Sequence, residues 1–177
     1  MENTGENYLA SVRKLFLYYK SLTDRAIAQL NDEQLHWQYN NESNSIAVVM
    51  QHIAGNSISR WTDFLNSDGE KSTRDRDMEF EETTLNKEDL TALWEKGWQC
   101  LFDALAPLTE NDLARIIYIR GEAHTVTEAI NRQLAHLPYH VGQIVFLAKM
   151  MAAGDWKSLS IAKGGSKQFN ERKVSGK

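Results

Sequence analysis

Hydrophobic side chains recur at steps of three and four residues over four long segments of the chain, which is the spacing of one face of an α-helix. In the first segment, residues 6–30, the expected apolar face consists of Tyr8, Val12, Leu15, Tyr19, Leu22 and Ala26. The other predicted helices extend from just after Asn44 to Asn66, from Asn86 to Pro107 and from Thr125 to Gly154. Only two prolines and ten glycines interrupt the 177 residues, which favours long helices over a β-sandwich or barrel.

The segments between these helices carry capping and turn signals. Asn86 is a good helix N-cap, and Thr125 with Glu128 has the spacing of a capping box. Residues 116–119 predict a brief extended link. Residues 68–82 hold ten charged side chains, so we expect a solvated connection there, with a short helix at most.

These signals together predict an all-α fold. We expect one four-helix bundle over residues 1–162 and a basic C-terminal tail over residues 163–177. The net charge of −4 is the sum of +4 in the tail and −8 in the rest of the chain. An acidic body argues against nucleic acid as a partner, because phosphate contacts need a basic face. The tail is expected to be solvated and mobile.

Cysteine usage and hydropathy bear on where the protein works. The single cysteine, Cys100, excludes an internal disulfide, and we expect it to be buried and inert. Residues 1–6 lack the basic region and apolar run of a signal peptide. The most apolar stretch, residues 144–148, is far too short to span a bilayer. We therefore expect a cytoplasmic protein without a membrane partner.

The histidines carry the clearest chemical signal. His136 and His140 lie four residues apart on the last predicted helix, so both imidazole rings can reach one point. They lie at the edge of the apolar face, and His52 has the same kind of position on the second helix. Three histidines from two facing helices would hold a divalent metal and leave a coordination position for water or substrate. The donors are compatible with nickel or zinc, our first expectation, and with iron or manganese.

Simpler interpretations of these residues stay open. A histidine pair at this spacing arises by chance in about one sequence in ten, and two half-buried histidines bonded only to their neighbours would give the same pattern. His36 and His124 are weaker candidates for a fourth ligand. Pro138 lies between the paired histidines, removes a backbone hydrogen bond and predicts a kink or bulge in the helix.

The order of features resembles the DinB/YfiT-like superfamily of four-helix bundle metalloproteins, and in particular an uncharacterised bacterial branch of it. A histidine in the second helix precedes a long charged connection and a His-x-x-x-His pair in the last helix; residues 59–65, 120–122 and 140–144 strengthen the likeness. The resemblance extends over about residues 6–170. It implies an up-down-down-up topology, often a homodimer, and a metal held by three histidines, here His52, His136 and His140.

The resemblance also implies candidate activities. The superfamily includes thiol-dependent S-transferases and isomerases that use low-molecular-weight thiols such as bacillithiol or mycothiol, and metal-dependent hydrolases. We therefore expect a metalloenzyme of S-transferase or hydrolase type, with Asn56 and Gln143 orienting ligands or substrate. Glu122 is an acid or base without an assigned role. The alternative is a non-catalytic, stress-related bundle that binds a partner or dimerises. Its core or interface would then include Trp61, Trp94, Trp98 and Trp156.

Overall fold

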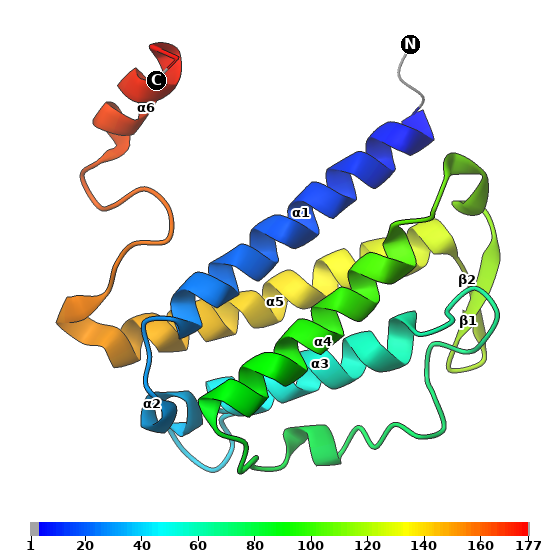
Figure 1. The fold of residues 1–177 in the computed structure, drawn as a ribbon, viewed down its shortest axis with the longest axis horizontal. Coiled ribbons are helices and arrows are strands. Elements are labelled where there is room, and N and C mark those ends of the chain that lie inside the picture. The colour runs from blue at the N-terminus through cyan, green and yellow to red at the C-terminus, as the bar shows by residue number, and fades with distance from the viewer. Residues whose placement is uncertain (1–3, 177) are drawn as a thin grey trace.

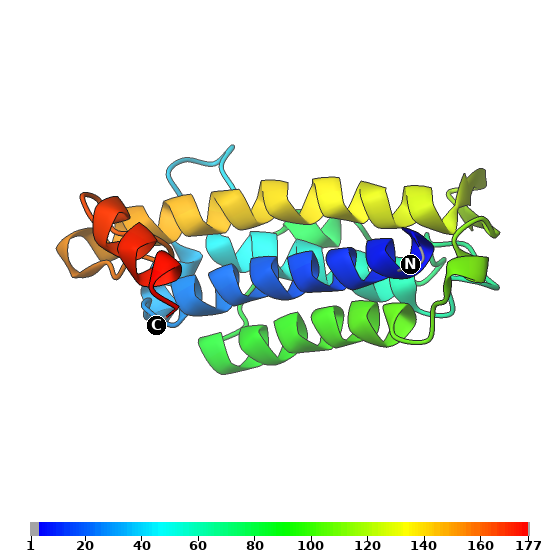
Figure 2. The same cartoon turned by 90° about the horizontal axis from the view of Figure 1, so that it is seen from above.

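The computed structural model describes residues 4–176 and is mostly helical. Four long helices lie side by side (Figures 1 and 2): α1 (Thr4–Ile27), α3 (Ile46–Trp61), α4 (Lys87–Leu105) and α5 (Val126–Ala152). α3 and α4 run in one direction, and α1 and α5 run in the opposite one (Figure 1). Residues 1–3 and 177, which belong to the N-terminal stretch and the basic tail discussed above, lie outside the described part.

Short elements connect and extend the long helices. They are the helices α2 (Asp32–His36) and α6 (Ser166–Val174), the 3-10 helices η1 (Met78–Phe80), η2 (Glu110–Asp112) and η3 (Ala153–Asp155), and the strands β1 (Ile116–Ile119) and β2 (Glu122–Thr125). The two strands form an antiparallel hairpin in which Ile119 pairs with Glu122. The two turn residues, Arg120 and Gly121, both have positive φ angles, of 56° and 76°, as tight hairpin turns require. The predicted extended link is thus one strand of a small sheet.

The apolar face of α1 differs from the predicted one. Leu9, Val12 and Phe16 are buried, whereas Leu15 is 40 % exposed. An apolar-rich helix offers two overlapping series of positions at steps of three and four residues, and packing selects between them. Phe16 is selected because its ring packs edge-on against Trp98, with ring centroids 6.5 Å apart.

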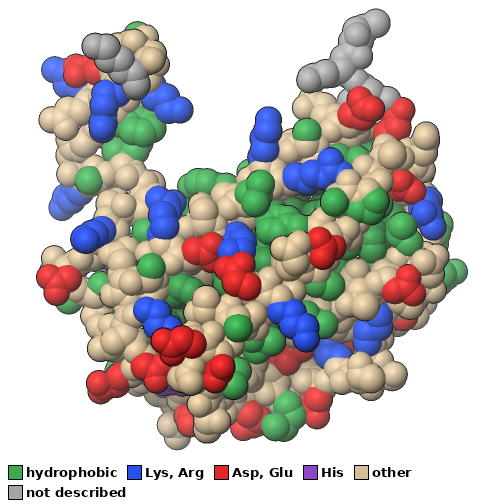
Figure 3. Space-filling view, viewed as in Figure 1, with side chains coloured by type: hydrophobic (Ala, Val, Ile, Leu, Met, Phe, Trp, Pro, Cys, Tyr) green, Lys and Arg blue, Asp and Glu red, His purple; other side chains and the backbone are tan. Residues whose placement is uncertain are grey.

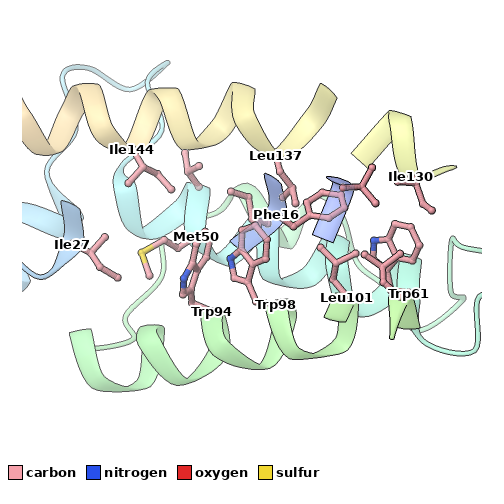
Figure 4. Packing of buried hydrophobic residues seen from close by; sticks show 14 of the residues in the cluster. Phe16, Ile27, Met50, Trp61, Trp94, Trp98, Leu101, Ile130, Leu137 and Ile144 are labelled. Carbon is pink, nitrogen blue, oxygen red and sulfur yellow. The ribbon is translucent and has the colours of Figure 1, made fainter. Parts of the chain in front are cut away.

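The core lies between the four long helices, where large apolar side chains from all of them meet (Figure 4). Trp94 and Trp98 of α4 are fully buried, with ring centroids 5.5 Å apart. Gly97 lies between them, and a Cβ atom there would approach the Ala54 Cα atom to 2.7 Å. α3 and α4 are therefore packed backbone to backbone, and Gly97 is the residue that permits it.

The predicted starts of α4 and α5 are confirmed, and the predicted end of α3 is wrong. Asn86 and Thr125 cap α4 and α5 with side-chain hydrogen bonds, and the Thr125 capping box is complete. α3, however, ends at Trp61 rather than at Asn66, because Asp63 adopts a left-handed φ of 46°. α5 continues through Pro138 to Ala152, so this proline does not end the helix.

One further expectation, the burial of Cys100, needs correction. Cys100 is half-buried rather than buried, and its Sγ atom lies 3.3 Å from the Thr62 hydroxyl. The basic tail contains a helix, α6, which stands apart from the long helices (Figure 1) and buries no residue. Lys and Arg side chains gather on this segment, whereas basic and acidic side chains are interspersed over the rest of the face in Figure 3. None of the helices within residues 4–176 combines the length and hydropathy needed to cross a membrane.

Candidate metal centre

Two rows of polar side chains face each other across α3 and α5. Each row steps by four residues, with His52, Asn56 and Arg60 on α3 and Arg132, His136 and His140 on α5. Residues four apart lie on the same side of a helix. We call the two facing rows the polar seam. Because the two helices run in opposite directions, the histidines face one another at one end of this seam and the arginines face one another at the other end. In the middle, the Gln133 amide donates to Asn56 Oδ1 at 3.4 Å.

The three predicted histidines converge on one point. His136 Nε2 lies 3.3 Å from His52 Nε2 and 3.1 Å from His140 Nε2. One ring nitrogen of each residue lies within 4.8 Å of the other two, so the group could hold a metal ion. His52 and His140 are buried and His136 is half-buried.

The Nδ1 atoms of His52 and His140, which point away from the histidine group, show which ring nitrogens carry the hydrogens. His52 Nδ1 is 2.9 Å from a Glu79 carboxylate oxygen, and His140 Nδ1 is 2.8 Å from the Gln143 amide oxygen. Both oxygens can only accept, so both Nδ1 atoms donate, and the Nε2 lone pairs of these rings point at His136. His136 has one hydrogen and cannot satisfy both lone pairs. A cation between the three nitrogens would satisfy both lone pairs.

The spacing of the nitrogens fits such a cation. Two nitrogens bound at about 2.0–2.1 Å to one tetrahedral ion lie about 3.3 Å apart. The observed separations of 3.3 and 3.1 Å are close to that value. Hydrogen bonds from ligating histidines to a carboxylate and an amide are also the usual surroundings of metal sites in proteins. The donor set, its spacing and its outer partners therefore suit a divalent ion.

Glu79 is held from two sides. Arg74 donates to both of its carboxylate oxygens, each at 2.7 Å, and also to Glu70 at 3.0 Å. Burial by itself would raise the pKa of the Glu79 carboxyl, but the hydrogen bonds from Arg74 and His52 outweigh it and lower this pKa. Glu79 is therefore ionised at neutral pH. The carboxylate lies against α3 at Gly55, where a Cβ atom would overlap it.

His136 and His140 are neutral at neutral pH. Burial, followed by the neighbouring His140 and His52, lowers the pKa of His136 to about 3. Burial also lowers the pKa of His140, although its bond to Gln143 opposes the shift. Neutral imidazole is the form that binds metal ions, so His136 and His140 need to lose no proton before they bind one.

The histidines line an open cavity of about 700 Å³. Phe80 and Tyr139 form apolar parts of its wall, and Asn56 and Gln143 form polar ones. Five arginines also line it: Arg60, Arg74, Arg76, Arg120 and Arg132. No aspartate or glutamate within residues 4–176 is part of this lining.

Sequence reasoning missed the contribution of the connection between α3 and α4. Residues 68–82 were expected to be solvated, yet the side chains of Arg74 and Glu79 are only 4 % and 9 % exposed. Nothing in the local pattern distinguishes these two charges from their neighbours. Arg60 and Arg132, by contrast, were detectable because they extend the four-residue spacing of the predicted histidines and Asn56.

The other candidates lie elsewhere. His36 Nε2 contacts the Leu85 carbonyl oxygen at 2.9 Å, and His124 lies on β2. Glu122 is exposed on the same strand and does not line the cavity. Of the two predicted orienting residues, Gln143 contacts a histidine directly, and Asn56 contacts Gln133.

The fold and the site together define a mostly helical protein with a three-histidine group that could hold a metal ion. Residues 3–165 match the DUF1572 family, described as proteins of unknown function, and the chain belongs to that family. The matched region contains all four long helices and the three histidines, and it ends before α6. No curated protein matches the chain.

Proposed function

We propose that this protein is a divalent-metal-dependent enzyme of the thiol S-transferase or hydrolase type, with His52, His136 and His140 as the metal ligands. The observation that carries the proposal is the convergence of three ring nitrogens at 3.1 and 3.3 Å, with the hydrogens of two rings directed outward. The directions of the four long helices also support a DinB-like up-down-down-up bundle as the scaffold.

Each residue around the group has a distinct task in this proposal. Glu79 and Gln143 hold the His52 and His140 rings with Nε2 facing inward. Three protein ligands leave a coordination position open towards the cavity, where Asn56 and Tyr139 line the approach. A bound divalent ion would lower the pKa of a water molecule or thiol at that position and so supply a nucleophile at neutral pH.

Nickel or zinc fits the all-imidazole donor set best, with iron or manganese as alternatives. Iron in oxygen-dependent enzymes usually has two histidines and a carboxylate, and manganese prefers oxygen ligands. Glu79, the carboxylate nearest to the group, is already bonded to Arg74 and to the outer face of His52.

Metal analysis of purified protein tests the proposal directly. We expect about one equivalent of divalent metal in wild type from metal-replete medium, and at least a tenfold lower content in His136→Ala. His124→Ala is the matched control, because His124 lies on β2 outside the group, and it should keep the metal. Wild type without stoichiometric metal, or equal loss in both variants, would refute a specific site.

The reaction type is tested on the metal-loaded protein. One set of assays follows the loss of low-molecular-weight thiols in the presence of an electrophile, and the other follows ester or amide hydrolysis without thiol. Activity in either set that disappears in His136→Ala and persists in His124→Ala supports the enzyme. Absence of both activities in a fully metal-loaded protein favours the non-catalytic alternative.

The alternative function is a stress-related binding or dimerisation module. It is favoured by three exposed apolar side chains along one side of α5: Tyr139, Phe146 and Met150 are 64 %, 66 % and 45 % exposed. Sedimentation analysis of wild type and Phe146→Ser tests it. A homodimer that the substitution weakens supports an interface on α5, and a wild-type monomer at all concentrations excludes a homodimer.

A further inference from the structure

The cavity beside the histidines concentrates positive charge in an otherwise acidic body. Five of the nine arginines in the chain line it, whereas no lysine within residues 4–176 does. Arginine presents a planar fork of donors that matches carboxylate and phosphate groups, whereas lysine offers a single ammonium. The choice of residue type therefore indicates recognition of oxyanions rather than a general attraction of anions.

Three of the five arginines already have partners. Arg74 is bonded to Glu79 and Glu70, and Arg120 Nε also reaches Glu70, at 3.3 Å. Arg76 lies 4.0 Å from Asp77 and over the Phe80 ring, 4.8 Å from its centroid. Their charges are therefore at least partly compensated within the protein.

Arg60 and Arg132 lack such partners. Neither side chain has a hydrogen bond, or a carboxylate within 4.0 Å, among residues 4–176. Arg60 is only 6 % exposed, and its Nε atom is buried without an acceptor. Burial, followed by the charge of Arg132, lowers the pKa of Arg60 to about 10, so its guanidinium remains charged at neutral pH.

A buried charge without a partner is unfavourable unless something supplies one. Arg60 and Arg132 lie on facing helices at one end of the polar seam, and the histidines lie at the other end, in the same cavity. A group held by these arginines therefore lies next to the histidine group. A cavity of about 700 Å³ is also of the size that binds small molecules.

We propose that Arg60 and Arg132 clamp an oxyanion group, a carboxylate or phosphate, of a small-molecule substrate whose remainder extends to the histidine centre. The proposal deepens the proposed function and rests on it, because the bound molecule is a substrate only if the protein is an enzyme. The anion site itself depends only on the arginines. Asn56 and Gln133, between the two groups in the seam, are placed to contact the intervening part of such a molecule.

Calorimetric titration with inorganic phosphate and, separately, with malonate tests the site at constant ionic strength. We expect saturable binding of at least one of the two ions to the wild-type protein, and affinity at least tenfold lower in Arg60→Met and in Arg132→Gln. Arg132 is exposed, so its substitution should leave folding intact even if Arg60→Met does not fold. Arg25→Gln, an exposed arginine on α1 outside the cavity, is the control and should bind like wild type. The ion bound more tightly shows whether the site prefers phosphate or carboxylate.

The same titrations on metal-free wild type and on His136→Ala separate this inference from the proposed function. Binding that persists without metal and is lost in Arg132→Gln supports the arginine site even if the protein holds no metal. Binding that needs His136 and metal, but is unchanged in both arginine variants, places the anion on the metal and overturns the inference. No saturable binding of either ion to wild type, or equal weakening in Arg25→Gln, overturns it as well.

Discussion

The side chains of Arg74 and Arg60 line the same cavity and are both buried, yet their surroundings are opposite. Arg74 donates to two carboxylates, and its side chain is 4 % exposed. Arg60 is 6 % exposed and finds no acceptor in the part of the chain that the structure describes. A buried charge with hydrogen-bonded partners is a structural element. A buried charge without them indicates that the folded protein is built for a ligand it does not itself provide.

The difference extends to the pKa values of the two arginines. Burial lowers the pKa of both, but the bonds to Glu79 and Glu70 more than reverse this for Arg74, whose pKa is raised. For Arg60, neighbouring arginines reinforce the effect of burial, and its pKa falls to about 10. Arg74 supports the histidine group through Glu79 and His52. Arg60, at the other part of the cavity, supports no other side chain among residues 4–176 and is free to bind a ligand.

The largest effect is expected when Arg74 is made to resemble Arg60. Glu79→Ala leaves the Arg74 guanidinium without its main acceptor and removes the bond to His52. Breaking a buried pair by removing one partner costs about 3–5 kcal/mol, so the free energy of unfolding in urea should fall by that amount. Metal affinity, measured by chelator competition, should fall about 10- to 100-fold.

Glu81→Ala is the matched control for this substitution, because Glu81 is a nearby exposed glutamate of the same connection. It should change the free energy of unfolding by less than about 0.5 kcal/mol. Equal and small effects of both substitutions would mean that the Arg74–Glu79 pair is not a structural element.

A smaller effect is expected when the same pair is displaced rather than broken. Gly55→Ala places a methyl group where the Glu79 carboxylate lies. Overpacking of this kind costs about 1–3 kcal/mol, measurable by urea denaturation. Gly142→Ala on α5 is the control; a Cβ atom there meets nothing within 4 Å, so helix propensity alone should stabilise it by up to about 1 kcal/mol. A stabilised Gly55→Ala variant would show that Glu79 moves freely.

The pH dependence tests the ring of His136, whose pKa the charges of Arg60 and Arg74 both help to lower. The folded-state pKa of His136, about 3, is below the value of about 6.5 expected in the unfolded chain, so the unfolded chain takes up the proton first as pH falls. The stability due to this group is complete above pH 6.5 or so and declines as pH falls towards 3. Linkage allows about 2 kcal/mol between pH 7 and 5, and screening of the exposed part of the ring reduces this to about 1 kcal/mol.

This decline is measured on metal-free protein, by urea denaturation at pH 7 and at pH 5. His136→Gln should lose about 1 kcal/mol less than wild type over the interval, because the titrating ring is gone. Most carboxylates remain ionised above pH 5, so they contribute little to the difference. An identical slope in the two proteins would contradict the lowered pKa of His136.

The smallest effect on stability is expected where a charge without a partner is removed. Arg60→Met keeps the length of the side-chain stem that packs against Gly69 but removes the guanidinium. In a buffer free of phosphate and carboxylates, its free energy of unfolding should stay within about 1 kcal/mol of wild type or rise. A loss of more than about 2 kcal/mol would show that Arg60 is a structural residue like Arg74.

Much of the helical structure was predictable because its signals are local. The cap at Asn86, the capping box at Thr125 and the spacing of apolar residues indicated where α4 and α5 begin. The convergence of the three histidines was predictable for a related reason: residues at four-residue steps share one side of a helix. Only the facing of the two helices had to be assumed.

Other features were decided by tertiary packing. The buried face of α1 includes Phe16 rather than Leu15, since Phe16 meets Trp98 from another helix. A single-sequence pattern does not distinguish two overlapping apolar series when both have helical spacing. The pairing of β1 with β2 was likewise missed. The hairpin turn is fixed by the Asp68 carboxylate, which accepts from the Arg120 and Gly121 amides at 2.8 and 2.7 Å.

By itself, then, the sequence determined the positions of most long helices, the spacing of the histidines and the scarcity of turns within the helical segments. Each of these depends on residues within a few positions of one another. Tertiary structure alone decided that the charged connection folds back, that Glu79 reaches His52 from 27 residues away, and that Arg60 ends without a partner. Whether a charge is solvated, paired or left for a ligand depends on which surfaces meet in space, and no local pattern of residues encodes that meeting.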